Sequence, residues 1–412
     1  MNLSPESKRF MEFFIDDFET YYRRYTHHVQ KELDNIYHSL FKQLVSASNY
    51  MSLVHLSGKL TEVVIRDQTP LSHLVDANVI PDDIRKFIKN EATHYLVYEC
   101  KVLDRLAKIV FVLYTDEELL RLDTYDMYAR MMFMWIKMAS VCARINCSRV
   151  LTVYCYMTPF KKELPTNLLR TIGTAHCNSA VTYSCRQKNE ICIYRKEEFF
   201  KVFIHETFHA FGLDFSELSQ TNINQQIREI FPLDIEFNSF EAYCEFWATI
   251  INCAFCAYNI AGTKCTRDEF GLYIDFCIRF ERMFSLFQLN KVLRYMSLDY
   301  TDLYEDTQVP RSLRQTLYKE NTNVFSYYIL KSLLLYYYPE FLSWCNRNNC
   351  GLYKFSRYRA NVLRFLEFIK KYKENLELRE DLVLMRIKAS DYATLLGISN
   401  LAKTMRMTMC AF

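Results

Sequence analysis

Glycine and proline are scarce in this chain, and their scarcity limits what it can fold into. Seven glycines and eight prolines are spread over 412 residues, and no stretch is rich enough in either to serve as a free linker. Half of the residues are hydrophobic and 24% are charged, which suffices for a large core. The sequence therefore predicts compact, helix-rich packing and excludes a disordered chain, a collagen and a small disulfide scaffold.

Charge and hydropathy limit the possible partners. The 51 Lys and Arg residues are opposed by 48 Asp and Glu residues, and the resulting net charge of +3 is too small for the positive field that nucleic-acid binding uses. The most apolar stretch, residues 246–261, contains two asparagines and is shorter than the ~20 residues of a membrane-spanning helix. We expect no nucleic-acid partner and no membrane span.

The fifteen cysteines are diluted in a long chain whose N-terminal residues are charged where a secretory signal would be apolar. We therefore expect reduced thiols, an intracellular reducing compartment and no secretion. Cys253 and Cys256 form a C-x-x-C pair, but no second pair at zinc-ribbon spacing accompanies them. The pair is predicted to be two buried core thiols.

The hydrophobic pattern divides the chain into three predicted regions. Residues 1–145 and 263–412 carry apolar residues at helical spacing and are predicted to be helical, the first region throughout and with a long helix over residues 10–42. Residues 146–262 are predicted to hold the strands and the functional core. The expected fold is α+β and predominantly helical, with a small central mixed β-sheet.

The middle region mixes strand and helix patterns. Residues 150–157 are β-branched and aromatic with a period near two, and residues 179–184 and 190–194 are two further predicted strands. Residues 167–173 are predicted to form a short helix. A longer helix is expected over residues 195–212, where the apolar period changes and a glycine provides the stop.

His205, Glu206 and His209 form an H-E-x-x-H motif within that longer helix. Histidines four apart lie ~40° apart around a helix and ~6 Å along it, so both imidazoles can reach one metal ion. The composition predicts only roughly 0.02 such motifs by chance in this chain. We interpret the motif as a zinc site with Glu206 beside a metal-bound water. The alternative is a pair of ordinary histidines on an amphipathic helix.

A catalytic zinc needs a third protein ligand and one open position. In one scheme that ligand follows the helix directly, but Phe215 occupies the expected position and Asp214 stands one residue early. In the other scheme Glu241, on a second buried helix, is the third ligand, and Glu245 one turn later accepts a hydrogen bond from a ligand imidazole. The alternatives are a capping box with Asn238 for Glu241 and a solvated helix position for Glu245.

Metallopeptidases, one class of protein with such a zinc site, also bind their substrate as an added β-strand on a sheet edge. Small side chains let another backbone approach such an edge. The predicted edge residues are Asn178, Ser179, Ala180 and Val181. They could equally form an internal strand. His176 is a candidate transition-state donor, with a structural role as the alternative.

Three stretches carry a family resemblance: HCNSAVTYS at 176–184, EICIYRKEEFFKVFIHETFHAFGLDFS at 190–216 and NSFEAYCEFWA at 238–248. They resemble the zinc metallopeptidases encoded by nucleocytoplasmic large DNA viruses, which have a gluzincin-type site. The resemblance covers about a quarter of the chain. It implies a zincin-like core, in which the mixed sheet packs on the H-E-x-x-H helix.

The same resemblance assigns roles to individual residues. It implies Zn²⁺ as the cofactor, bound by His205, His209 and Glu241. Glu206 would be the general base, and Glu245 would be the acidic residue behind a ligand imidazole.

The predicted function is zinc-dependent hydrolysis of a peptide or protein substrate, with Glu206 taking the proton of a zinc-bound water and later delivering it to the leaving amine. Tyr243 and Tyr183 are candidates for holding the oxyanion. For a viral protein the resemblance implies the host cytoplasm and leaves open packaging in the virion with other virion proteins. Two alternatives stay open: a catalytically silent structural or virion-associated protein with the metallopeptidase fold, and a helical interaction module with a fortuitous motif.

Overall fold

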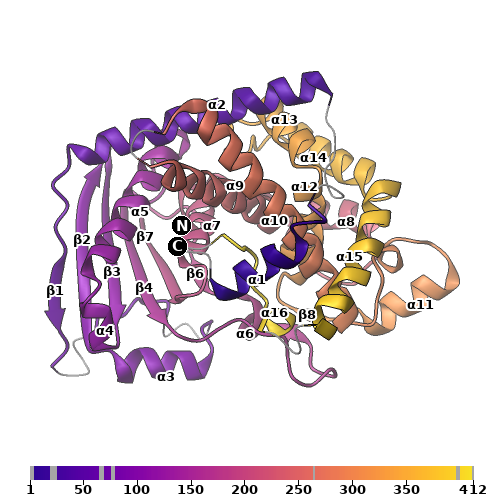
Figure 1. Ribbon diagram of the computed structural model, residues 1–412, viewed down its shortest axis with the longest axis horizontal. Coiled ribbons are helices and arrows are strands. Elements are labelled where there is room, and N and C mark those ends of the chain that lie inside the picture. The colour runs from indigo at the N-terminus through magenta and orange to yellow at the C-terminus, as the bar shows by residue number, and fades with distance from the viewer. Residues whose placement is uncertain are drawn as a thin grey trace.

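A six-stranded sheet lies against a larger body of helices in the computed structural model (Figure 1). The structure describes residues 4–18, 26–64, 69–75, 79–262, 265–395 and 400–410. The fold is α+β, 58% of it is helical, and the sheet is mixed. The predicted fold class is confirmed at this level.

Both strand directions occur in the sheet. Its strands are β1 (Lys59–Glu62), β2 (His94–Val102), β3 (Arg105–Leu113), β4 (Val150–Thr158), β6 (Ala180–Thr182) and β7 (Lys188–Arg195). Their spatial order is β1-β2-β3-β4-β7-β6. β4 runs parallel to both of its neighbours, β3 and β7, whereas all other neighbouring pairs are antiparallel. β6 is therefore an edge strand that runs antiparallel to β7.

The first three strands correct a prediction. The expectation that residues 1–145 are helical throughout is wrong at residues 59–62, 94–102 and 105–113, which form β1, β2 and β3. Residues 109–113 of β3 are all buried, so their apolar run lacks the alternation of a half-exposed strand and looks like a buried helix. The predicted boundary at residues 145 and 146 falls within the sheet, because β3 pairs with β4 across it.

The predictions for the middle region are mostly confirmed. β4, β6 and β7 occupy the three predicted strands. The helix predicted over residues 167–173 is wrong: Leu168 and Leu169 are exposed and have no core to pack on. The segment instead ends in β5 (Ile172–Gly173), which pairs with β8 (Glu320–Asn321) in a small second sheet, and α6 (Thr174–Cys177) follows.

Successive side chains of the strands point to opposite faces and so build two cores. In β3, Ile109 and Phe111 join the main core, which contains α5 (Leu122–Cys142) and α7 (Phe199–Phe211). Val110 and Val112 join a smaller core on the other face, covered by α3 (Asp82–Glu91). The sheet thus lies between two helical layers of unequal size.

From residue 265 to 403 the described residues follow the predicted helical pattern, apart from β8 and the loops between helices, whereas residues 404–410 are not helical and correct the prediction. The long helix predicted over residues 10–42 is wrong in extent, because α1 and α2 are separate helices; residues 19–25 lie outside the described residues. No helix in the described ranges combines the length and apolar character needed to cross a membrane. The further helices are α1 (Pro5–Phe14), α2 (His27–Ser52), α4 (Asp116–Leu119), α8 (Gln220–Ile230), α9 (Ser239–Ala261), α10 (Arg267–Tyr295), η2 (Tyr300–Leu303), α11 (Gln308–Leu317), η3 (Phe325–Leu330, a π-helix), α12 (Lys331–Tyr336), α13 (Tyr338–Asn348), α14 (Arg359–Tyr372), α15 (Leu376–Leu395) and α16 (Asn400–Lys403).

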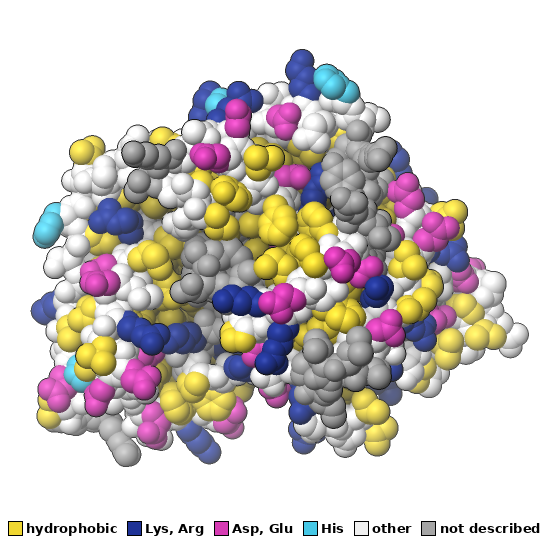
Figure 2. Space-filling view, in the orientation of Figure 1, with side chains coloured by type: hydrophobic (Ala, Val, Ile, Leu, Met, Phe, Trp, Pro, Cys, Tyr) yellow, Lys and Arg dark blue, Asp and Glu magenta, His cyan; other side chains and the backbone are white. Residues whose placement is uncertain are grey.

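Residues 404–410 run through the interior beside α1 (Figure 1). There the Ser7 hydroxyl donates to the Met409 carbonyl at 3.0 Å. On the face shown in Figure 2, basic and acidic side chains are interspersed rather than gathered into one basic patch. That mixed surface agrees with the small net charge of the sequence.

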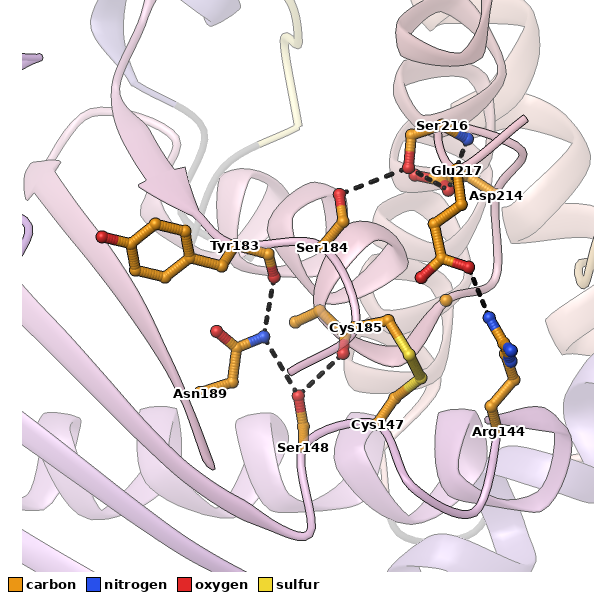
Figure 3. The surroundings of a disulfide bond; sticks show 12 residues. Arg144, Cys147, Ser148, Tyr183, Ser184, Cys185, Asn189, Asp214, Ser216 and Glu217 are labelled. Carbon is orange, nitrogen blue, oxygen red and sulfur yellow. Dashed lines mark hydrogen bonds and ion pairs between the residues drawn. A yellow bond between two sulfur atoms is a disulfide. The ribbon is translucent and has the colours of Figure 1, made fainter. Parts of the chain in front are cut away.

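One disulfide corrects the expectation of reduced thiols. Cys147, after α5, is bonded to Cys185, in the turn between β6 and β7, and the other thirteen cysteines are free. Figure 3 shows this bond beside the end of α7. The Cys185 amide donates to the His209 carbonyl at 3.1 Å, and the Ser148 hydroxyl donates to the Ala210 carbonyl at 2.8 Å. The bond therefore fastens this turn next to the helix that carries the H-E-x-x-H motif.

Candidate metal centre

The H-E-x-x-H motif lies on α7, a helix buried along its whole length between the sheet and α9. Gly212 ends α7 in the left-handed conformation, with φ of +63°, and its amide donates to the His209 carbonyl at 3.1 Å. His205, Glu206 and His209 are only 6–8% exposed. Polar groups buried this deeply are costly without partners, so the groups around them decide what the site can do.

Three side-chain atoms from α7 and α9 converge at one point. Nε2 of His205 lies 3.1 Å from Nε2 of His209, and Oε2 of Glu241 lies 3.0 Å from the first and 3.5 Å from the second. Tetrahedral zinc with bonds of about 2.0–2.2 Å to nitrogen and oxygen separates its ligand atoms by about 3.3–3.6 Å. The predicted ligand set fits zinc in chemistry, and its spacing is close: one distance lies in this range, and the other two are shorter than its lower end by about 0.2–0.3 Å.

A carboxylate contacts the second nitrogen of each imidazole. Oε1 of Glu245 lies 2.8 Å from Nδ1 of His205, and Oδ2 of Asp214 contacts Nδ1 of His209. Such contacts fix the ring orientation and leave Nε2 free to act as a ligand. Asp214, the alternative third ligand predicted from the sequence, thus lies at the Nδ1 atom of His209, whereas the Nε2 atom of that ring faces His205.

The electrostatics of the cluster favour a cation. Burial opposes charge on His205, but Glu245 and Glu241 outweigh it and raise the pKa of the imidazole to about 9. Burial likewise opposes charge on Glu241, yet His209 and His205 lower the pKa of that carboxyl to about 2. Carboxylates therefore face the imidazoles on both sides, as in a site that holds a positive ion.

Glu206 lies beside this cluster in a different environment. Burial raises the pKa of its carboxyl, while the two imidazoles oppose the shift. Glu206 and His205 line a small pocket together with Asn178, Ser179 and Ala180, at the start of the edge strand β6. Val181 instead packs with the smaller core on the opposite face of the sheet. The structure thus brings three of the four predicted edge residues to the site.

Tyr327, which the sequence analysis missed, also lines the pocket. It comes from the π-helix η3, and its hydroxyl lies 3.4 Å from Oε2 of Glu241. π-Helical turns are frequent at functional sites, but residues 325–330 show only a run of apolar and aromatic side chains in the sequence.

The other oxyanion candidates are engaged elsewhere. The Tyr243 hydroxyl donates to the Tyr353 carbonyl at 2.9 Å in the core, and the Tyr183 ring lies beneath the guanidinium of Arg186. His176 accepts the Gly173 amide at its Nδ1 atom, a local structural role.

The capping alternative for Glu241 is not realised. Asn238 precedes α9 without capping it through its side chain, which donates to Asn323 instead. Glu245 is 4% exposed and also pairs with Lys201, so it is not a solvated position.

Comparisons with known proteins gave no match: no family model, no curated protein and no solved structure is significantly similar to this chain.

Proposed function

We propose that this protein is a zinc-dependent peptidase. The observation that carries the proposal is the convergence of His205 Nε2, His209 Nε2 and Glu241 Oε2 beside a carboxyl of raised pKa and an edge strand. The packing of α7 against β6 and β7 supports the zincin-like arrangement that the family resemblance implies. A zinc ion in this site would supply Lewis acidity, which acidifies water and polarises a peptide carbonyl.

Glu206 would act as the general base. Burial raises the pKa of the Glu206 carboxyl toward neutral pH, which makes its carboxylate a stronger base. It could then accept the proton of the attacking water and return it to the leaving amine. The Tyr327 hydroxyl lies next to Glu241, one of the proposed zinc ligands, where it could donate a hydrogen bond to the oxyanion of the transition state.

The substrate would be an extended peptide or protein segment. Among the described residues no further strand pairs with the outer edge of β6, so an incoming backbone could add there beside His205 and Glu206. A viral origin, virion packaging and an intracellular location are further parts of the proposal, and they rest on the family resemblance.

Purified zinc-loaded protein and a peptide library test the proposal. We expect cleavage by the unaltered protein, and a 10²–10⁴-fold loss of turnover in Glu206→Gln with zinc still bound, because only proton transfer is removed. Glu236 is exposed, and the same substitution there, Glu236→Gln, is the matched control that should leave turnover unchanged. Full cleavage by Glu206→Gln, or a protein that binds no zinc, would refute the mechanism.

A second candidate function is a catalytically silent protein that keeps this fold and binds zinc for stability. Met407 belongs to residues 404–410, the buried C-terminal segment, and lines the same pocket as His205. Glu206 is only 8% exposed. A zinc-loaded protein that melts earlier on chelation and cleaves no peptide of the library would favour this function.

A further inference from the structure

A second group of metal-binding side chains lies deep in the helical body. Cys253 and Cys256 are three apart on α9, and Cys277 and Glu281 are four apart on α10, so each helix directs two donors to one side. Cys410 joins them from the C-terminal segment. All five are at most 2% exposed. Cys253 is twelve residues beyond Glu241, about 18 Å along α9, so this group is separate from the candidate metal centre.

Three of these side chains have the spacing of metal ligands. Sγ of Cys253, Sγ of Cys410 and a carboxylate oxygen of Glu281 all lie within 4.8 Å of one another. Tetrahedral zinc holds two sulfurs about 3.8 Å apart and a sulfur and an oxygen about 3.6 Å apart, so each pair would need to close by at most about 1.2 Å. Cys256 and Cys277 also interact with the Cys410 thiol, and either can supply a fourth donor.

The Glu281 carboxylate has one oxygen with partners and one without. Oε1 accepts the amides of Met409 and Cys410, each at 2.8 Å, and the hydroxyl of Thr408. Oε2 is buried and has no hydrogen-bond partner among the described residues. A buried carboxylate oxygen left in this state is unfavourable, and a cation at the cluster would give it a partner.

Packing of uncharged thiols is the competing explanation. Burial raises the pKa of Cys253 and of Cys256, which favours protonated thiols when no metal is bound. Free cysteines are often buried as small apolar groups. That explanation accounts for the sulfurs, and the buried ammonium of Lys331 offsets the charge of Glu281, but among the described residues Oε2 still has no hydrogen-bond partner.

We propose that Cys253, Cys410 and Glu281, with Cys256 or Cys277 as the fourth donor, bind a structural zinc ion. The ion joins α9 and α10 to the C-terminal segment. That segment also carries Met407, which lines the pocket beside His205. The proposal does not depend on peptidase activity, since none of its ligands belongs to the α7 site.

Metal analysis, which counts the zinc ions per chain, and X-ray absorption at the zinc edge, which identifies their ligands, test it directly on the unaltered, zinc-loaded protein. We expect two zinc ions per chain and sulfur ligands at about 2.3 Å in addition to nitrogen and oxygen at about 2.0–2.1 Å. One zinc with nitrogen and oxygen ligands only would overturn the inference and leave the proposed function standing. One zinc with sulfur ligands would support the inference and count against the proposed function.

Variants assign the second ion to its residues. Cys253→Ser with Cys410→Ser should lose one of the two zinc ions and lower Tm, whereas the buried thiol control Cys155→Ser should keep both ions. His205→Ala with His209→Ala should keep the sulfur-bound ion, a result that does not require the cysteine variant to fold. Retention of two ions by the cysteine variant, or loss of all sulfur ligation in the histidine variant, would overturn the inference.

Discussion

His205 has a carboxylate at each ring nitrogen: Glu241 near Nε2 and Glu245 near Nδ1. His209 repeats the arrangement with Asp214 at Nδ1. At the residue scale, the carboxylates of the site therefore fall into two groups, those near an Nε2 atom and those near an Nδ1 atom. In the proposed zinc site Glu241 would be a ligand, whereas Glu245 and Asp214 would orient the imidazole rings of the two histidine ligands.

The Tyr327 hydroxyl is expected to act in the transition state rather than in folding. Tyr327→Phe should lower kcat by about 10²–10³-fold, because one donor to the oxyanion is lost, and should leave KM and zinc content near those of the unaltered protein. The control is Tyr243→Phe, which removes a core hydrogen bond and should lower the free energy of unfolding by about 1 kcal/mol with kcat unchanged. Equal kcat values for the two variants would contradict the role of Tyr327.

Glu320 should make stability depend on pH. Burial raises the pKa of its carboxyl to about 7, against the hydrogen bonds it accepts from Tyr318 and from the Phe325 amide. Between about pH 4.5 and 7 the folded protein keeps a proton that the unfolded chain has lost, so this carboxyl lowers stability as pH rises through that range.

The substitution Glu320→Gln removes that titration while retaining an acceptor. We expect the free energy of unfolding, measured with urea, to rise by about 1–3 kcal/mol at pH 8 and to change little at pH 4.5. Glu236→Gln, on the surface, controls for the loss of a charge. A gain of the same size at both pH values would show that titration of Glu320 is not responsible.

At the scale of elements, the sequence predicted those parts whose pattern is local. The helix around the motif and the strands at 150–158 and 188–195 have a clear period and clear stops, so they could be predicted. β3 could not be separated from a buried helix because both of its faces are covered. Tyr327 was missed because it lies 86 residues beyond Glu241 in the chain, and no local pattern encodes the contact between them.

The disulfide between Cys147 and Cys185 is expected to stabilise the turn beside α7. It closes a loop with a sequence separation of 38, and Cys147→Ser with Cys185→Ser should lower the free energy of unfolding by about 2–4 kcal/mol under non-reducing conditions. The exposed free cysteine variant Cys350→Ser should unfold like the unaltered protein. Urea unfolding distinguishes these cases, and an unchanged midpoint for the double variant would contradict a stabilising bond.

At the scale of the whole molecule, residues far apart in the chain meet around two buried polar centres. α7, α9 and η3 supply the first, and α9, α10 and the C-terminal segment supply the second. Helix α9 contributes to both, with Glu241 and Glu245 in its first turns and Cys253 and Cys256 farther along. Residues 404–410 connect the two centres, since Glu198, just before α7, accepts the Met407 and Thr408 amides.

Anomalous diffraction at the zinc edge, from crystals of the zinc-loaded protein, tests the first centre most directly. The account predicts a peak about 2.0–2.2 Å from Nε2 of His205, Nε2 of His209 and a carboxylate oxygen of Glu241. A map without a peak between these three atoms, in a protein that retains its fold, would contradict it.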